Sequence, residues 1–264
     1  PLRIALLKDA DDPLALQTAL GIAAMLFVDA SFGPLGLLQL GGSIGAWVIV
    51  GIGCLLAIAQ FIKWLTRGQG MTPPPLLMWA CAPAVAVLLV AATSAPGWLW
   101  STEFGGYDAL SYHLQLPHEW LALGSMQPLE HNVYSYLPGY VEAAFYHLAV
   151  LKGDAIEAVY ACQLLHALIA LITAWLIARI GRRLDGQMAG IVAAVLMIGT
   201  PWVIVTGSLA YNEMVVTLML AAGMLAEMEQ RVPPWRRGAM IGMFAAAACG
   251  AKLTAVGMAA VPLG

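Results

Sequence analysis

Charged side chains are scarce in this chain of 264 residues. Lys, Arg, Asp and Glu together make up 10% of it, and apolar residues make up 61%. Soluble domains usually have about 25% charged and about 45–50% apolar residues. A soluble core cannot bury so much apolar surface, so this shortage excludes an ordinary soluble protein. With a mean hydropathy of +0.81, we expect lipid to be the solvent for most of the chain.

Cysteine and several familiar catalytic motifs are also rare or missing. Each of the four cysteines lies in a different apolar run without the spacing of metal ligands, which favours inert thiols buried in lipid. The sequence has no Gly-rich phosphate loop, no Ser-His-Asp arrangement and no basic patch for nucleic acid. No segment alternates as the strands of a membrane barrel do, so helices are the expected spanning form.

Long apolar runs, in contrast, are abundant. A bilayer core needs about 20 apolar helical residues to cross it. The sequence therefore predicts an all-α polytopic membrane protein with about seven transmembrane helices, of which the first and sixth are short. The seven runs are residues 14–30, 43–64, 76–96, 155–178, 187–208, 213–228 and 239–262. An apolar run also precedes Gly264, and we expect the chain to be a fragment truncated at its C-terminus.

The distribution of basic residues predicts the orientation. Of the 12 Lys and Arg residues, all but Lys152 and Lys252 fall on one side of the predicted membrane. The positive-inside rule then puts the N-terminus in the cytoplasm and residues 97–154 in the periplasm or outside the cell. We expect an integral protein of a bacterial inner membrane. The basic residues on the inner side are Arg3, Lys8, Lys63, Arg67, Arg179, Arg182, Arg183, Arg231, Arg236 and Arg237.

The outer loop at 105–154 is the polar part of the chain. It holds four of the five histidines and six of the eight tyrosines. Hydrophobic periodicity predicts two helices lying in the membrane interface, one over 109–122 with a bend at Pro117 and one over 139–151. In the second, Glu142 and His147 lie off the apolar stripe. A polar, aromatic and acidic loop between apolar segments is where we expect chemistry.

Two acids on the outer side are candidate catalytic groups, and each also has a purely structural explanation. Asp108 opens the first interfacial helix, either as an N-cap or as a general base. Glu213 begins the sixth apolar run, where Asn212 would cap the helix and Glu213 would meet its positive dipole end. If the two carboxylates meet, they share a site as base and partner acid, or they bind a cation.

A lysine, one histidine and three tyrosines complete the candidate set. Lys252 lies inside the seventh apolar run, either as a structural ion pair or as a phosphate contact. His113 lies nearest to Asp108 in the sequence and is a candidate orienting residue. The spacing of the four loop histidines fits no compact metal site. The aromatic candidates for substrate binding are Tyr107, Tyr134 and Tyr136, although an interfacial belt explains such residues equally well.

Four motifs taken in chain order then give a family resemblance. They are Gly-Tyr-Asp-Ala-Leu-Ser-Tyr-His at 106–113, Asn-Val-Tyr-Ser-Tyr-Leu-Pro at 132–138 after Gly124, Tyr-Asn-Glu at 211–213, and the run from Gly242 to Thr254. In this order they resemble the GT-C class of integral-membrane glycosyltransferases. The most similar group is the dolichyl-phosphate-mannose protein mannosyltransferase superfamily with its bacterial relatives. The resemblance covers about residues 76–264.

The resemblance implies transfer of a sugar from a polyprenyl-phosphate donor to a lipid, glycan or protein acceptor, with inversion at the sugar carbon. Asp108 would be the base, and cationic groups would bind the departing phosphate. Two departures leave the sugar open: Ala109 stands where many members have a second acid, and Leu137 stands where some relatives have a lysine. The cofactor stays open: the sequence itself requires none, and a divalent metal is an alternative. The resemblance divides the chain into an N-terminal hairpin at 1–68 and a catalytic region at 69–264.

Two other functions compete with an enzyme. A transporter or flippase for lipid-linked sugars would place its polar residues at interrupted helices near the bilayer midplane. The polar residues here gather instead at the outer surface, and the sequence has no internal repeat, which favours an enzyme. A scaffold subunit of an envelope complex would tolerate substitution of Asp108.

Overall fold

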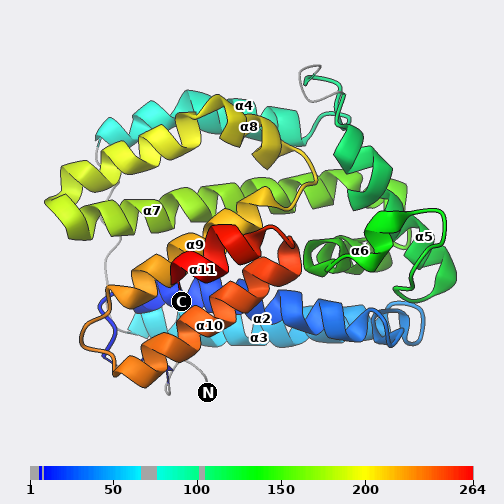
Figure 1. Ribbon diagram of the computed structural model, residues 1–264, viewed down its shortest axis with the longest axis horizontal. Coiled ribbons are helices and arrows are strands. Elements are labelled where there is room, and N and C mark those ends of the chain that lie inside the picture. The colour runs from blue at the N-terminus through cyan, green and yellow to red at the C-terminus, as the bar shows by residue number, and fades with distance from the viewer. Residues whose placement is uncertain (1–5, 8, 67–75, 101–104, 264) are drawn as a thin grey trace.

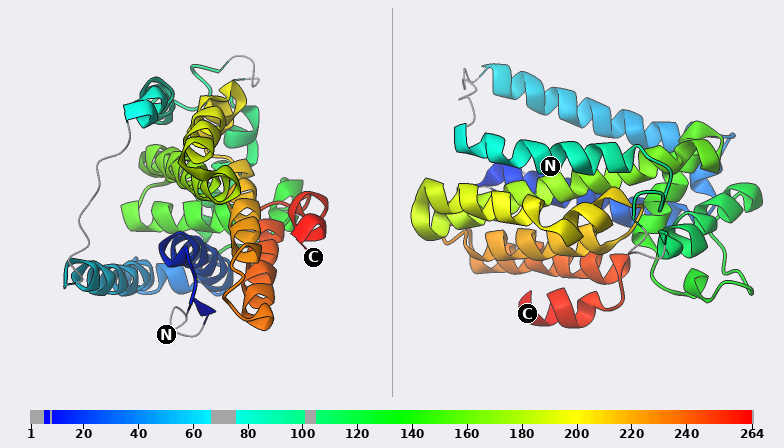
Figure 2. Two further views of the ribbon diagram at one scale, coloured as in Figure 1. Left: turned by 90° about the vertical axis from the view of Figure 1, so that its left-hand side faces the viewer. Right: turned by 90° about the horizontal axis from the view of Figure 1, so that it is seen from above.

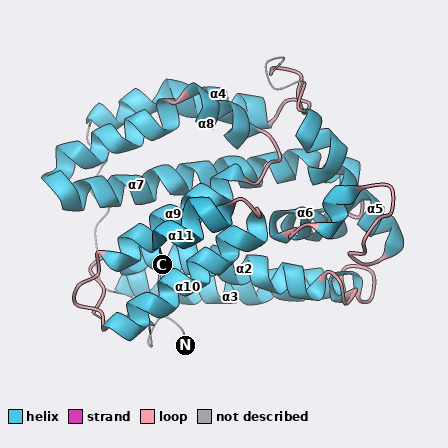
Figure 3. Cartoon of the chain, in the orientation of Figure 1, coloured by secondary structure: helices cyan, strands magenta, loops and turns pink. Residues whose placement is uncertain are grey.

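The computed structural model describes residues 6–7, 9–66, 76–100 and 105–263, and every element in these ranges is helical. Figure 3 shows helices joined by loops, with no strand in the described part of the chain. The all-α prediction is therefore confirmed. Of the basic residues used to predict the orientation, Arg3, Lys8 and Arg67 lie outside the described residues.

Most of the predicted apolar runs form helices with nearly the expected bounds. The long elements are α2 (Pro13–Phe32), α3 (Ile44–Thr66), α4 (Ala82–Ala92, extended backwards by the 3-10 helix η2, Leu76–Cys81), α7 (Ala155–Gly199), α8 (Pro201–Ser208), α9 (Glu213–Glu227) and α10 (Pro234–Ala251). Within the described residues, α2 and α7 are long and apolar enough to cross a membrane, and α8 with α9 makes a third candidate if their 117° bend lies within one span. This supports a membrane protein, while seven spans remain a prediction.

The element α7 is two helices joined at a tight turn. Asp185 and Gly186 have non-helical backbone angles, with Gly186 at φ 77°. A Cβ at Gly181 would come within 3.0 Å of the backbone of Gly190, so the two arms of the turn touch without side chains between them. The sequence prediction of separate runs at 155–178 and 187–208 has its break at this turn. Figure 1 shows the chain reversing there and returning along α8.

Helix α7 packs against α4 and α8 on one side and against α6 and α9 on the other. Helices α2 and α10 pack in turn against α6 and α9, and the two further views in Figure 2 show the arrangement. The largest apolar cluster joins α2, α6, α7, α9 and α10 through small and branched side chains such as Ala19, Ala170, Val215 and Ala248. Small residues let helix backbones approach closely, which is how helices associate in lipid.

The polar loop folds at one end of this bundle (Figure 1). It begins with a π-helix, η4 (Ala109–His113), followed by α5 (Gln115–Leu123), the 3-10 helix η5 (Val133–Tyr136) and α6 (Tyr140–Lys152). The predicted bend is present, but the break falls at Leu114, so that Pro117 lies in the first turn of α5. There its missing N–H has no helical partner to lose.

The interpretation of 139–151 as a helix with a polar face was wrong. In α6, both Glu142 and His147 are buried, together with most of their neighbours. His147 Nδ1 lies 2.8 Å from Asp29 Oδ1 of α2, and its Nε2 lies 3.2 Å from the carbonyl of Ala46 in α3. Buried polar groups need such partners. Helix α6 is therefore a core element that contacts α2, α5, α7 and α10.

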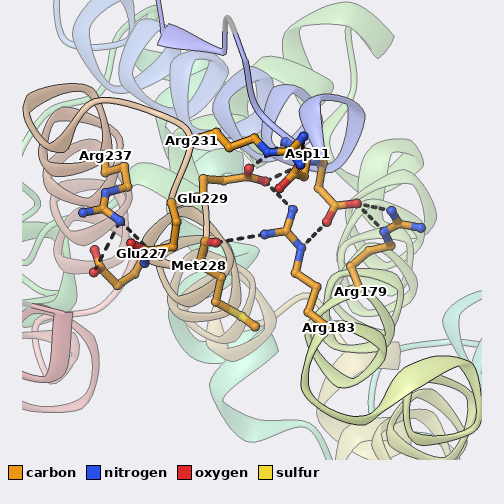
Figure 4. Close-up of polar contacts among 10 residues, drawn as sticks. Asp11, Arg179, Arg183, Glu227, Met228, Glu229, Arg231 and Arg237 are labelled. Carbon is orange, nitrogen blue, oxygen red and sulfur yellow. Dashed lines mark hydrogen bonds and ion pairs between the residues drawn. The ribbon is translucent and has the colours of Figure 1, made fainter.

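A charged cluster holds the opposite end of the bundle together (Figure 4). Asp12 receives hydrogen bonds from Arg179 Nε at 2.5 Å and Arg183 Nε at 2.6 Å, while Arg183 also donates to Glu229 at 2.6 Å. Glu229 is fully buried, and it accepts the backbone N–H groups of Asp11 and Asp12. The cluster fixes the start of α2 to the end of α9 and to the first arm of α7.

The seventh apolar run is not one continuous helix. Helix α10 ends at Ala251, Lys252 is extended at φ −154° and ψ 128°, and the chain resumes as the π-helix η6 (Val256–Ala260) followed by α11 (Val261–Leu263). The prediction that Lys252 lies within a helix was therefore wrong. Apolar periodicity could not reveal the break, because the residues on both sides of Lys252 remain apolar.

Candidate functional site

Two interrupted helices meet at the site. The first interruption lies between α8 and α9, where the chain bends by 117°, and the second is the end of α10 at Lys252. Asn212 joins them, because its Nδ2 donates a hydrogen bond of 3.0 Å to the carbonyl of Ala251. We expected Asn212 to cap α9, but its side chain makes no capping hydrogen bond.

A buried histidine holds the bend between α8 and α9. The Nδ1 atom of His166 lies 2.8 Å from the carbonyl of Leu209 and 3.0 Å from that of Thr206. Its Nε2 accepts the N–H of Met214 at 3.2 Å. Because carbonyls only accept, this network fixes the tautomer with the proton on Nδ1. The position of Glu213 at the head of α9 thus depends on a histidine that the sequence did not single out.

Lys252 and Glu213 form an ion pair across the two interruptions. Glu213 lies in the first turn of α9, where the helix dipole favours a negative charge. Both side chains are about one-third exposed, at 34% and 33%, so the pair is open to the surroundings. A lysine has three N–H donors, and Nζ therefore keeps donors for a further partner.

A cavity of about 280 Å³ opens beside this pair. Its polar lining comes from Lys252, Asn212 and Glu142, which belong to three different elements. Its aromatic wall comes from Tyr112 and Tyr134, and all other lining residues except Thr254 are aliphatic. The remaining lining residues are Leu116, Leu137, Pro138, Ala251, Leu253 and Thr254.

The aromatic wall is a stacked pair. The rings of Tyr112 and Tyr134 lie 4.1 Å apart between centroids, at an interplanar angle of 16°. Burial raises the pKa of Tyr112 above its ordinary value, and the negative charge of Asp108 raises it further, as do those of Glu142 and Glu213. The Tyr112 hydroxyl therefore stays neutral. Three carboxylates that are far apart from one another in the sequence all raise the pKa of this one side chain.

His113 and Glu142 form a buried pair behind the cavity wall. His113 Nδ1 lies 2.5 Å from Glu142 Oε1, and both side chains are at most 5% exposed. The rings of Tyr112 and Tyr211 flank His113, at centroid distances of 4.0 and 5.4 Å. The second oxygen of Glu142 has no hydrogen-bond partner within the described part of the chain. His113 thus orients Glu142, a residue that sequence reasoning did not select for the site.

Asp108 stands at the N-cap position of η4, but its side chain makes no capping hydrogen bond. It is half-buried, four residues before Tyr112, and no ion pair or hydrogen bond of its carboxylate occurs among the described residues. The N-cap explanation therefore does not account for it. An unpaired carboxylate near the cavity is chemically available, which a general base requires.

Some of the predicted residues lie elsewhere. Tyr107 and Tyr136 are more than 60% exposed and do not line the cavity, whereas Tyr134 does. His118 is exposed, and His131 pairs with Glu119 at the surface. Burial raises the pKa of Glu119, but hydrogen bonds from Gln115 and His131 outweigh it and lower the pKa overall. In the described residues, no three His, Cys, Asp or Glu side chains are grouped as a metal site.

Comparison of the chain with protein-family models, with curated proteins and with solved structures found no match. The resemblance to GT-C glycosyltransferases thus stays a prediction made from the motifs. The fold brings together three of the seven predicted site residues: Lys252 and Tyr134 line the cavity, and Glu213 pairs with Lys252. Tyr112, Glu142 and Asn212 join them through the fold.

Proposed function

We propose that this chain is an integral-membrane glycosyltransferase of the GT-C type, which transfers a sugar from a polyprenyl-phosphate donor to an acceptor hydroxyl. The observation that supports it best is the cavity where Lys252, the Tyr112–Tyr134 pair and Glu142 converge. A lysine binds phosphate oxygens as a point charge, and aromatic faces give a sugar ring a flat apolar wall. A polyprenyl-phosphate sugar needs both features next to each other, because its sugar is bonded directly to its phosphate.

In the proposed reaction Asp108 takes the proton of the acceptor hydroxyl. The acceptor oxygen attacks the anomeric carbon as the bond from that carbon to the phosphate oxygen breaks, so the configuration inverts. The polyprenyl phosphate leaves with the bonding electrons, and Lys252 stabilises the charge that develops on it. Glu213 positions the Lys252 ammonium through their ion pair, and His113 orients Glu142.

We place the site on the outer face of a bacterial inner membrane, with the N-terminus in the cytoplasm and seven spans. In support, Arg179, Arg183 and Arg231 gather at one end of the bundle (Figure 4), and the cavity lies near α5 and α6 at the other. A cysteine replacing the exposed Gln127 tests this orientation in intact cells. A membrane-impermeant thiol reagent should label it from outside; labelling only after permeabilisation contradicts the topology.

A transporter of lipid-linked sugars is the second candidate, and one observation favours it. The interrupted helices α8–α9 and α10 face each other at Glu213 and Lys252, and transporters often build their binding sites from such discontinuous helices. Against it, the sequence shows no internal repeat. The two functions differ in their products, because an enzyme breaks the bond between sugar and phosphate and a transporter leaves it intact.

The deciding assay uses the full-length protein in lipid vesicles with a radiolabelled polyprenyl-phosphate sugar. An enzyme moves the label to an added lipid, glycan or peptide acceptor and leaves free polyprenyl phosphate. A transporter moves intact donor between leaflets without changing it. Label found only on intact donor, across a panel of hexoses and pentoses, contradicts the glycosyltransferase.

A further inference from the structure

Two buried oxygen atoms beside the cavity have no hydrogen-bond partner among the described residues. They are Glu142 Oε2 on α6 and Asn212 Oδ1 at the head of α9. Each belongs to a side chain more than nine-tenths buried, at 3% and 6% exposed, and both residues line the same cavity. Buried acceptors normally have partners, and an orphaned one requires a specific explanation.

The chemical character of both atoms is fixed by their neighbours. Asn212 donates its Nδ2–H to the carbonyl of Ala251, so its Oδ1 must be the free acceptor. Glu142 uses Oε1 for His113, which leaves Oε2 as the free acceptor. The two positions are distant in sequence, and the packing of α10 against both α6 and α9 brings them to one cavity.

We propose that Glu142 and Asn212 are the residues that select the sugar, each accepting the hydrogen of one hydroxyl group on a single monosaccharide ring. This inference rests on the proposed function for the choice of a sugar as ligand. A hydroxyl donates one hydrogen, which suits both a carboxylate and an amide oxygen. Much of the rest of the lining is apolar and aromatic, from Tyr112, Tyr134, Leu137 and Pro138. A sugar ring matches this division, since its edge carries hydroxyls and its faces carry C–H groups.

The size of the cavity limits the ligand to one ring. Its volume of about 280 Å³ lies at the lower bound of ligand pockets, which begin at about 300 Å³. The ring would lie between the two acceptors and the aromatic wall, with its phosphate towards Lys252. An oligosaccharide would have to extend out of the cavity past the exposed residues Leu253 and Thr254.

The test compares binding of sugar 1-phosphates with binding of inorganic phosphate to the full chain in nanodiscs, measured by saturation-transfer NMR. We expect at least one sugar 1-phosphate, from a panel of hexoses and pentoses, to bind about 30-fold more tightly than phosphate. Glu142→Gln should weaken binding of the sugar phosphate about 10-fold and leave phosphate binding unchanged, and Asn212→Ala should weaken binding of the sugar phosphate about 3-fold. Glu130→Gln, an exposed acid of the same loop, should bind as the wild type does.

Monodeoxy analogues separate recognition from a merely structural role. Wild type should bind two of them about 10-fold and 3-fold more weakly than the parent sugar phosphate, and each variant should lose the discrimination at one position only. If no sugar 1-phosphate binds more tightly than phosphate, or if the variants weaken all analogues equally, the inference is overturned. Selective binding of a sugar phosphate without any sugar transfer would support this inference and contradict the proposed glycosyltransferase activity.

Discussion

The ammonium of Lys252 contacts the carboxylate of Glu213 across 39 residues of sequence, at the place where two interrupted helices meet. One partner follows the last residue of α10 and the other is the first residue of α9. A charge within an apolar run needs a partner to remain there. The pair therefore explains how both charges are tolerated, and it fixes a cation at the mouth of the cavity.

Breaking this ion pair should lower the free energy of unfolding, and the effect of each substitution should depend on whether the other charge is still present. Lys252→Gln and Glu213→Gln should each lower the free energy of unfolding by about 1–2 kcal/mol, between the values for exposed and buried pairs. The double variant should lose less than the sum of the two, by about 1 kcal/mol. Thermal unfolding in nanodiscs measures the cycle. Strict additivity would show that the two charges do not interact.

Gly250 should not tolerate even a methyl group. A Cβ there would come within 2.4 Å of the ring of Tyr140, which is itself held by Phe27 at a centroid distance of 5.3 Å. Gly250→Ala should destabilise the protein by about 1–3 kcal/mol through overpacking. A Cβ at Gly242, in the same helix, would meet no atom within 4 Å other than its own helix backbone. Gly242→Ala is thus the matched control, and it should be neutral or stabilising by about 0.5–1 kcal/mol. Equal effects at both positions would refute this packing of α10 on α6.

Arg183 should be the most sensitive residue of the charged cluster in Figure 4. It donates to Asp12 and to the fully buried Glu229, so Arg183→Gln would remove the arginine paired with Glu229 and leave Asp12 with Arg179 alone. We expect a loss of about 3–5 kcal/mol in unfolding free energy. The neighbouring Arg182 is exposed, and Arg182→Gln should change stability by less than about 0.5 kcal/mol. A denaturant or thermal series on both variants measures the difference, and similar values would contradict the buried network.

Removing the hydroxyl of Tyr146 should stabilise the protein. This side chain is fully buried, its hydroxyl has no partner within the described residues, and burial raises its pKa to about 12. Tyr146→Phe keeps the edge-on contact with Trp120 and removes an unsatisfied donor, worth about 1 kcal/mol. In an ultraviolet titration the variant should lose a tyrosine that ionises late. Destabilisation by Tyr146→Phe would mean that the hydroxyl has a partner after all.

The hydrophobic pattern was sufficient to predict the helices, since the apolar runs correspond to α2, α3, α4, α7 with α8, α9 and α10. It predicted the break at Asn212, which falls between the runs 187–208 and 213–228, but it could not reveal the interruption at Lys252, because the residues on both sides of Lys252 are mostly apolar. Interruptions depend on tertiary partners such as His166 and the carbonyl of Ala251. Those partners are separated from the breaks by about 40 residues, beyond the reach of local patterns.

The sequence predicted only part of the candidate site, because the rest of the site also depends on tertiary packing. Glu213 and Lys252 stood out as isolated charges in apolar surroundings, and each proved to be the partner of the other. Glu142 was read as a surface acid, because its helix has an apolar stripe that does not include it. Packing of α6 within the bundle buries every face of that helix, and burial turned an ordinary acid into a lining residue of the cavity.

The central claim is that Asp108 acts as the base in sugar transfer, and single-turnover transfer from a labelled polyprenyl-phosphate sugar tests it most directly. With the full-length protein, Asp108→Asn should lower the rate constant of transfer by about 10²–10⁴ while donor binding is retained. Glu130→Gln, which removes an exposed acid from the same loop, should transfer at the wild-type rate. Undiminished transfer by Asp108→Asn would contradict the claim.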